Sequence, residues 1–141
     1  MNIAMAGRGD GIVAAMKALI VDDSEEVRRM IKAFIVDLID DFVDCGDGCD
    51  ALSLYTRHRP DLVLMDIEMK QMDGLTATKQ IRTAYPRANV IIVSQWDSPA
   101  LRTSAARAGA SGYINKEDMA PLRALLASGR MGDSSSVSKE K

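Results

Sequence analysis

The chain has 141 residues, a formal net charge of −2 and a hydrophobic share of 47%, which are ordinary values for one globular domain. No apolar run reaches the about 18 residues that mark a membrane-spanning helix. No basic block occurs, which argues against nucleic acid as a partner. The first residues lack the features of a secretion signal, so the two cysteines, Cys45 and Cys49, are expected as free thiols. We therefore expect a cytoplasmic protein with no membrane partner.

Both ends of the chain have the composition of flexible segments. Residues 1–15 are rich in glycine and alanine, and residues 129–141 contain three consecutive serines and few apolar residues. We expect a flexible N-terminal tail over 1–15, one folded domain over 16–128 and a disordered C-terminal tail over 129–141.

The first half of the domain alternates short apolar runs with helical patterns. The run at 18–21 is strand-like and ends in two aspartates, and Ser24 is placed to cap a following helix. The core face of that helix is predicted from apolar residues at helical spacing: Val27, Ile31, Phe34, Ile35 and Leu38. A weaker strand at 42–45 is followed by a helix that Pro60 stops.

The second half repeats the alternation three times. Leu62 to Met65 form an uninterrupted apolar run, typical of a strand buried on both faces, and a helix runs from Gly74 to Pro86. A second run of this kind at 90–93 precedes a helix that starts near Pro99. The last strand, 112–115, precedes an amphipathic helix around 119–126.

Five strand–helix repeats with short connections predict an α/β fold. Right-handed crossovers between parallel strands place helices on both faces of the sheet. We expect a five-stranded, doubly wound parallel sheet in three layers, of the flavodoxin-like (βα)5 type.

Four of the five strands end in a residue whose side chain can bind a ligand or take part in a reaction. These residues are Asp22 and Asp23, Asp66, Ser94, and Lys116. Because the carboxyl ends of parallel strands share one edge, their side chains are expected to converge on a cleft. Neighbouring carboxylates repel each other, and Mg²⁺ bound by oxygen ligands removes that repulsion. A metal ion and an ammonium group together suit a phosphoryl group, which a carboxylate can attack in line.

This order of residues resembles the receiver domain of two-component response regulators, the CheY-like family. The matching phrases are Val21-Asp22-Asp23-Ser24 with Arg28-Arg29 after it, Leu64-Met65-Asp66-Ile67 running to Met72-Asp73-Gly74, and Ala108-Gly109-Ala110-Ser111-Gly112-Tyr113 before Lys116. The resemblance implies a stand-alone phosphorylation switch over 17–128. It also implies that the domain is not an enzyme for diffusible substrates and catalyses only its own phosphorylation and dephosphorylation.

The resemblance also implies a role for each matched acidic position. Asp66 matches the phosphoacceptor, which receives a phosphoryl group from a sensor histidine kinase or a histidine phosphotransfer protein. Asp22 and Asp23 match the acidic pair that binds Mg²⁺, with Asp23 as the direct ligand. Asp66 itself and the backbone carbonyl of Glu68 complete the metal ligands.

The remaining matched positions concern the response to phosphorylation. Ser94 matches the switch hydroxyl, Tyr113 the switch aromatic, and Lys116 the lysine that pairs with the phosphoryl group. The output is binding to a downstream protein target. A chemotaxis-type motor ligand, a phosphorelay shuttle and a phosphate sink all fit this pattern.

Three positions depart from the family pattern. Glu117 follows the lysine where many receivers have proline, and Lys70 stands where proline is common after the acceptor. Gln95 replaces a small residue beside the switch hydroxyl and is expected to narrow access to the acceptor. A degenerate receiver that only docks is therefore one alternative.

Other patterns suggest weaker alternatives. A phosphatase or phosphotransferase with an aspartyl nucleophile would use Glu68 as its second acid, but the domain leaves no room for a cap domain. Cys45, Cys49 and the single histidine are too few for a typical zinc site. The aspartates around Gly48 lack the spacing and final glutamate of a calcium loop.

Overall fold

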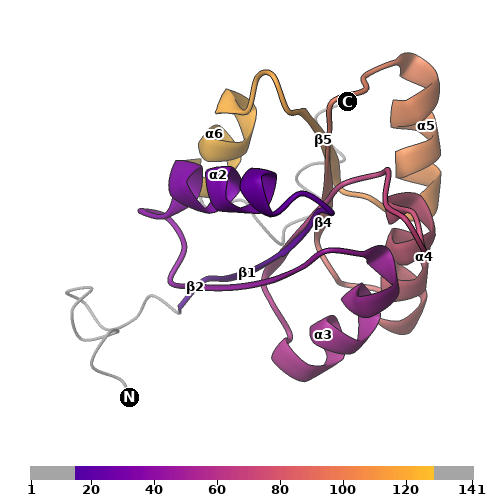
Figure 1. Cartoon of the computed structure of the whole chain (residues 1–141), viewed down its shortest axis with the longest axis horizontal. Coiled ribbons are helices and arrows are strands. Elements are labelled where there is room, and N and C mark those ends of the chain that lie inside the picture. Colours follow the sequence, from indigo (N-terminus) through magenta and orange to yellow (C-terminus); the bar gives the residue numbers. More distant parts are fainter. Residues whose placement is uncertain (1–14, 129–141) are drawn as a thin grey trace.

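The computed structural model describes residues 15–128, which form one parallel sheet with helices on both faces (Figure 1). The strands lie in the order β2-β1-β3-β4-β5. Their bounds are β1 (Lys17–Val21), β2 (Asp41–Cys45), β3 (Leu62–Met65), β4 (Val90–Ser94) and β5 (Gly112–Asn115). The helices are α2 (Glu25–Ile35), η1 (Gly48–Asp50), α3 (Ala51–His58), α4 (Gly74–Ala84), α5 (Pro99–Ala108) and α6 (Ala120–Ser128). The predicted five-stranded doubly wound fold is confirmed.

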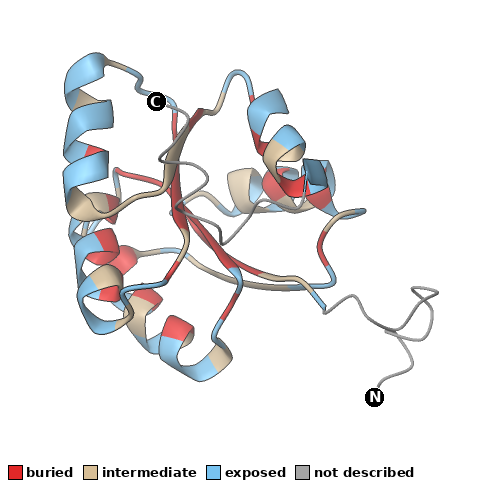
Figure 2. Cartoon of the chain, turned by 180° about the vertical axis from the view of Figure 1, so that it is seen from behind, coloured by how far each residue is buried: buried red, intermediate tan, exposed pale blue. Residues whose placement is uncertain are grey.

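The sheet separates two hydrophobic cores. Helices α2 and α6 cover one face, and α3, α4 and α5 cover the other (Figure 1). Strands β1, β3 and β4 are buried on both faces, so the sheet is the most buried layer of the molecule (Figure 2). This explains why 62–65 and 90–93 are apolar without alternation.

Side-chain caps fix where three of the helices begin. The Ser24 hydroxyl accepts a hydrogen bond from the Val27 N–H at 3.2 Å, as predicted. Asp73 and Ser98 cap α4 and α5 in the same way. Each cap satisfies an N–H that has no partner inside its helix.

The predicted core face of α2 is partly wrong. Ile31 and Ile35 are buried, and Val27 and Leu38 pack against the same core, although Leu38 lies beyond the end of the helix. Phe34, by contrast, is 37% exposed. The Phe34 ring lies under the guanidinium of Arg123 from α6, at 5.8 Å, so it covers the seam between two helices instead of entering the core.

The predicted tails and the predicted absence of a membrane-spanning helix are compared here with residues 15–128. The tails predicted at 1–15 and 129–141 lie outside the described residues, apart from Ala15, and stay predictions. Across 15–128, every helix is too short or too polar to cross a bilayer.

The strand order creates a crevice at one edge of the sheet. The chain leaves β1 in one direction to form β2 and then returns to form β3 on the other side of β1. Ligands of such sheets bind at this switch point, beyond the carboxyl ends of the strands. Val21 and Met65 are the last paired residues of β1 and β3, so Asp22 and Asp66 leave the sheet side by side.

Candidate functional site

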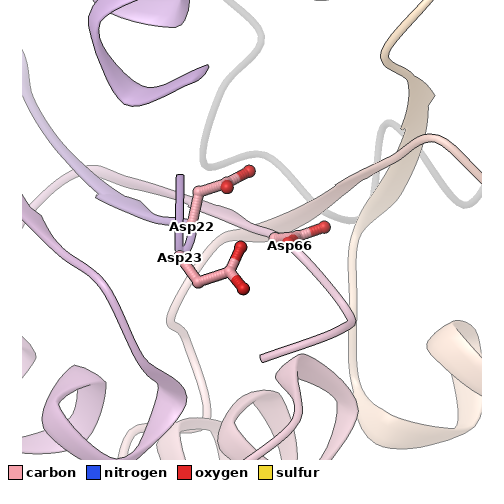
Figure 3. A group of neighbouring side chains, drawn as sticks. All are labelled: Asp22, Asp23 and Asp66. Carbon is pink, nitrogen blue, oxygen red and sulfur yellow. The ribbon is translucent and has the colours of Figure 1, made fainter. Parts of the chain in front are cut away.

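Three carboxylates meet beyond the ends of β1 and β3 (Figure 3). Asp22 and Asp66 are buried, with 2% and 7% of their surface exposed, whereas Asp23 is exposed. One oxygen from each carboxylate lies within 4.8 Å of the other two. The structure thus brings together the three acids that the sequence predicted, and two of them have lost most of their contact with water.

Backbone hydrogen bonds continue the sheet through these acids. The Asp66 N–H donates to the Val21 carbonyl at 2.9 Å, and the Asp22 N–H donates to the Cys45 carbonyl at 3.1 Å. The Asp22 side chain is further fixed because its Oδ1 accepts from the Ser24 N–H at 2.9 Å. The acids therefore sit on rigid strand ends and not on free loops.

Lys116 reaches the acids from the end of β5. Its Nζ lies 2.9 Å from Asp22 Oδ2 and 3.2 Å from Asp66 Oδ1. Its backbone N–H donates to the Ser94 carbonyl at 2.9 Å, which fixes the start of the side chain. Burial alone would lower the pKa of this ammonium, but its contacts with Asp22 and Asp66 hold the pKa above its usual value.

The protonation of Asp66 responds to the same surroundings. Burial and the nearby charge of Asp22 raise the pKa of Asp66 to about 6, although Lys116 acts in the opposite direction. A carboxylate that is partly desolvated beside a second negative charge is a common feature of functional sites.

A cleft of about 310 Å³ opens above these groups. Its lining consists of Asp22, Asp23, Ser24, Val27, Asp66, Glu68, Gln95, Trp96 and Lys116. Glu68, Gln95 and Trp96 are exposed, so they form the rim of the cleft. Gln95 therefore lies where the sequence predicted it would limit access to Asp66.

Ser94 and Tyr113, the two predicted switch residues, lie outside the lining of the cleft. Ser94 is 1% exposed, and its hydroxyl accepts a hydrogen bond from the Trp96 N–H at 3.0 Å. Tyr113 is half-buried, and its hydroxyl donates to the Trp96 carbonyl at 2.5 Å. Both side chains thus contact the backbone of the same residue at the rim.

The donor set fits a small, hard divalent cation. Asp22 Oδ2 is buried and accepts no hydrogen bond of normal geometry within 15–128, although it pairs with the Lys116 ammonium. Carboxylate oxygens, completed by water and phosphate oxygens, are the ligands that Mg²⁺ prefers. Within the described part of the chain, this is the one group of three or more acids, histidines or cysteines spaced for a metal ion.

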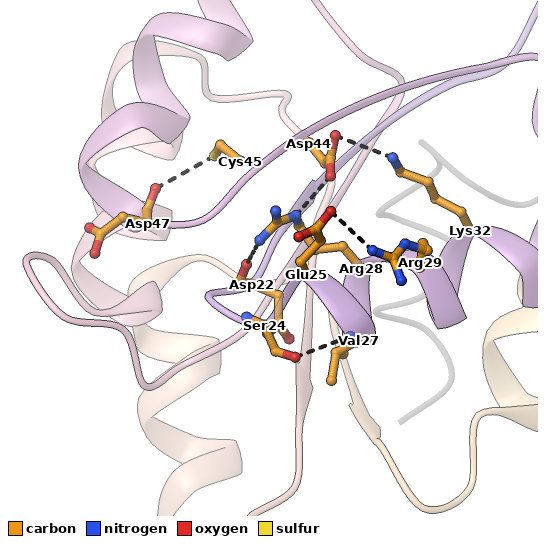
Figure 4. A network of polar contacts seen from close by, with 10 residues as sticks. All are labelled: Asp22, Ser24, Glu25, Val27, Arg28, Arg29, Lys32, Asp44, Cys45 and Asp47. Atoms are coloured by element: carbon orange, nitrogen blue, oxygen red, sulfur yellow. Dashed lines mark hydrogen bonds and ion pairs between the residues drawn. The ribbon is translucent and has the colours of Figure 1, made fainter.

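An anchor behind the acidic pair was not predicted from the sequence (Figure 4). The Arg28 guanidinium donates to the Asp22 carbonyl at 2.6 Å and to Asp44 Oδ2 at 2.7 Å. Lys32 lies 3.2 Å from the other Asp44 oxygen. A basic residue four positions after the Ser24 cap was the available signal, because α2 places that residue beside β2.

The aspartates around Gly48 and the two cysteines make contacts that do not involve a metal ion. Asp44 pairs with Arg28 and Lys32, and Asp47 accepts hydrogen bonds from backbone N–H groups. Cys45 and Cys49 are both free thiols. Burial raises the pKa of Cys45 to about 11, so its sulfur stays protonated at neutral pH.

The chain matches the sequence model of a known protein family. The match to the response regulator receiver domain covers residues 18–127 and so includes every predicted site residue. The chain belongs to the response regulator receiver family. The chemotaxis protein CheY of Bacillus subtilis is 38% identical to it over 103 residues, which are 72% of this chain and 86% of that protein. The CheY of Halobacterium salinarum is 33% identical over 107 residues, which are 76% of this chain and 89% of that protein.

Solved receiver structures share the fold. The Vibrio cholerae chemotaxis protein CheY4 is 27% identical with a TM-score of 0.73, and the alignment covers 84% of this receiver and 99% of that chain. The activated receiver domain of Klebsiella pneumoniae RstA, solved with BeF3, is 30% identical with a TM-score of 0.71, over 78% and 97% of the two chains. The acidic cleft thus lies in a receiver domain.

Proposed function

We propose that this receiver accepts a phosphoryl group on Asp66 from a phosphohistidine of a sensor histidine kinase or a histidine phosphotransfer protein. The observation that carries the proposal is the half-buried Lys116 ammonium, which lies between Asp22 and Asp66 at 2.9 and 3.2 Å. A half-buried cation beside a carboxylate that lines the cleft can pair with an oxygen of a phosphoryl group attached to that carboxylate.

The transfer forms one bond and breaks one bond. An Asp66 carboxylate oxygen attacks phosphorus while the bond from phosphorus to the donor imidazole nitrogen breaks, and its electron pair stays on that nitrogen. The product is an acyl phosphate on Asp66. Lys116 is then expected to pair with a phosphoryl oxygen, because the phosphorylated side chain occupies the cleft that Lys116 lines.

The proposed metal ligands are Asp22, Asp23, Asp66 and the backbone carbonyl of Glu68. Mg²⁺ would supply positive charge against the oxygens of the transferred group. Burial and the charge of Asp22 raise the pKa of Asp66 to about 6, and a bound divalent cation would favour the ionised carboxylate that attacks phosphorus. The proposal therefore includes a dependence on Mg²⁺.

The proposed output is a change in binding to a downstream protein. The acyl phosphate carries close to two negative charges where the Asp66 carboxylate carried one, and the hydroxyl of Ser94 is the proposed group that follows this change. Ser94 and Tyr113 both contact the Trp96 backbone, so a shift of Ser94 can reach the α5–β5 surface through one residue. A cytoplasmic location is part of the proposal, and the free thiols are consistent with it.

Intact mass spectrometry tests the transfer directly. The protein is incubated with Mg²⁺ and a small acyl phosphate donor, and one phosphoryl group is expected on the wild type and none on Asp66→Asn. EDTA is expected to abolish the modification. A folded wild-type protein that stays unmodified with donor and Mg²⁺ would show that the proposal is wrong.

A further inference from the structure

Asp47 connects two loops that are far apart in the sequence. Its Oδ1 accepts hydrogen bonds from the N–H groups of Cys49 and Met72, both at 3.0 Å, and its Oδ2 accepts from the Gln71 N–H at 2.8 Å. Cys49 belongs to the short helix η1 in the connection after β2, whereas Gln71 and Met72 belong to the loop between β3 and α4. One carboxylate thus fixes the backbone of both loops.

The two loops also pack backbone against backbone at this point. A Cβ on Gly48 would lie 2.5 Å from the Met72 carbonyl oxygen and 3.2 Å from the Asp73 carbonyl oxygen. Only glycine permits this approach without a shift of the loop. The contact at Asp47 is therefore part of a close fit between the loops.

The loop that Asp47 holds begins at the phosphorylation site. It runs from Asp66 through Glu68 to Gly74, and its far end is fixed because the Gly74 N–H donates to the Ile67 carbonyl at 2.8 Å. A Cβ on Gly74 would lie 1.7 Å from the Asp66 carbonyl oxygen. Between these two ends, the Gln71 and Met72 N–H groups have Asp47 as their acceptor.

We propose that Asp47 is a positioning residue of the phosphorylation site. Its carboxylate holds the 67–73 loop in the conformation that places the Glu68 carbonyl at the metal-binding acids and leaves Asp66 open to the donor. This inference rests on the proposed function, because it concerns the same site. Asp47 touches no reacting atom and acts only through the loop.

The chemistry of the contact supports this role. An ionised carboxylate that accepts several N–H groups makes hydrogen bonds about twice as strong as neutral ones. Truncating the carboxylate leaves the Gln71 and Met72 N–H groups without their protein acceptor. These groups can then form hydrogen bonds with water, and the loop is no longer held in one conformation. Outer residues that orient metal ligands typically change metal affinity by about 10- to 100-fold when they are removed.

Two substitutions and a matched control test the role. Asp47→Ala removes all three hydrogen bonds, and Asp47→Asn keeps one of the two acceptor oxygens. Asp61→Ala is the control, since Asp61 also accepts a backbone N–H, from Lys17 at 2.8 Å, but lies at the opposite edge of the sheet. For each folded variant, Trp96 fluorescence gives the Mg²⁺ affinity, and mass spectrometry gives the rate of phosphorylation by the acyl phosphate donor.

Asp47→Ala is expected to weaken Mg²⁺ binding about tenfold and to slow phosphorylation by a similar factor, with Asp47→Asn in between. Asp61→Ala is expected to match the wild type in both. In the metal-free protein, amide hydrogen exchange of Gln71 and Met72 is expected to accelerate in Asp47→Ala, and Asp61→Ala leaves it unchanged. Because Asp47→Asn retains part of the contact, it carries the test if Asp47→Ala does not fold.

The outcomes separate this inference from the proposed function. If the wild type binds Mg²⁺ and is phosphorylated, but the Asp47 variants match Asp61→Ala in affinity, rate and exchange, Asp47 is not a positioning residue. If the wild type itself is not phosphorylated, the proposed function is wrong. The exchange of Gln71 and Met72 then still decides whether Asp47 holds the loop.

Discussion

Two ion-pair clusters lie near the carboxyl edge of the sheet, and they differ in burial. In the first, Lys116 pairs with Asp22 and Asp66, and their side chains are 16%, 2% and 9% exposed. In the second, Arg102 forms two hydrogen bonds with Asp97, at 2.7 and 3.0 Å, and the two side chains are 51% and 27% exposed.

The difference in burial implies that the two ion-pair clusters have different roles. Charges removed from water carry a desolvation penalty that their mutual attraction only partly offsets, so a buried cluster is poor at adding stability. An exposed pair adds little either, because water and salt screen it. We infer that the buried cluster is retained for its charge and the exposed pair for the geometry of the loop beside Tyr113.

The largest expected effect follows from removing the half-buried Lys116 ammonium. Lys116→Met leaves the Asp22 and Asp66 carboxylates facing each other without compensation, and we expect the unfolding free energy at pH 8 in EDTA to fall by about 3 kcal/mol. At pH 5 the loss is expected to be much smaller, since Asp66 then carries a proton. Urea denaturation at the two pH values measures this, and equal losses at both would contradict the electrostatic explanation.

A second, smaller effect concerns the titration of Asp66. Its pKa is about 6 in the folded protein and 3.8 as a reference, so the folded state holds the extra proton between these values. Asp66 therefore contributes stability that is fully present below pH 4 and is lost as the pH rises through about 6. In EDTA, the loss between pH 5 and pH 8 attributable to this group is expected to be about 1 kcal/mol, because about half of the total loss already occurs below pH 5.

Asp66→Asn is the variant that isolates this contribution, because the amide does not titrate. The difference in unfolding free energy between Asp66→Asn and the wild type is expected to grow in favour of the variant from pH 5 to pH 8. The same difference at both pH values would mean that Asp66 titrates normally in the folded protein.

The sequence predicted the buried parts of the molecule better than its surface. The runs at 62–65 and 90–93 identified the central strands, because double burial removes all polar residues from a strand. The residue order at the strand ends identified Asp22, Asp66 and Lys116 as neighbours, because parallel strands end at the same edge. These inferences depend on topology alone and so do not require side-chain detail.

Contacts between loops and helix surfaces were not predictable in the same way. Asp47 is one of the aspartates of the weak calcium pattern around Gly48, and no local feature of the sequence indicates that it meets Gln71, 24 residues later. Phe34 fits a helical apolar face, yet Arg123 from the last helix covers it instead of the core. Both cases depend on how distant segments approach each other, which periodicity within one element does not encode.

The smallest expected effect on stability concerns the exposed pair. Arg102→Ala is expected to leave the unfolding midpoint unchanged, because the pair is screened by solvent. It should nevertheless alter the fluorescence of Trp96, since the Arg102 guanidinium lies 5.0 Å from the ring of Tyr113, whose hydroxyl donates to the Trp96 carbonyl.

A second arginine in the molecule provides the control for this prediction. Arg123 makes the same two-bond contact with Asp37 and lies over the ring of Phe34, on the opposite face of the sheet from α5. Arg123→Ala is expected to leave Trp96 emission and its quenching by iodide as in the wild type. If Arg102→Ala also leaves Trp96 emission and quenching unchanged, the exposed pair does not set the geometry of the rim. The two clusters would then differ only in their burial.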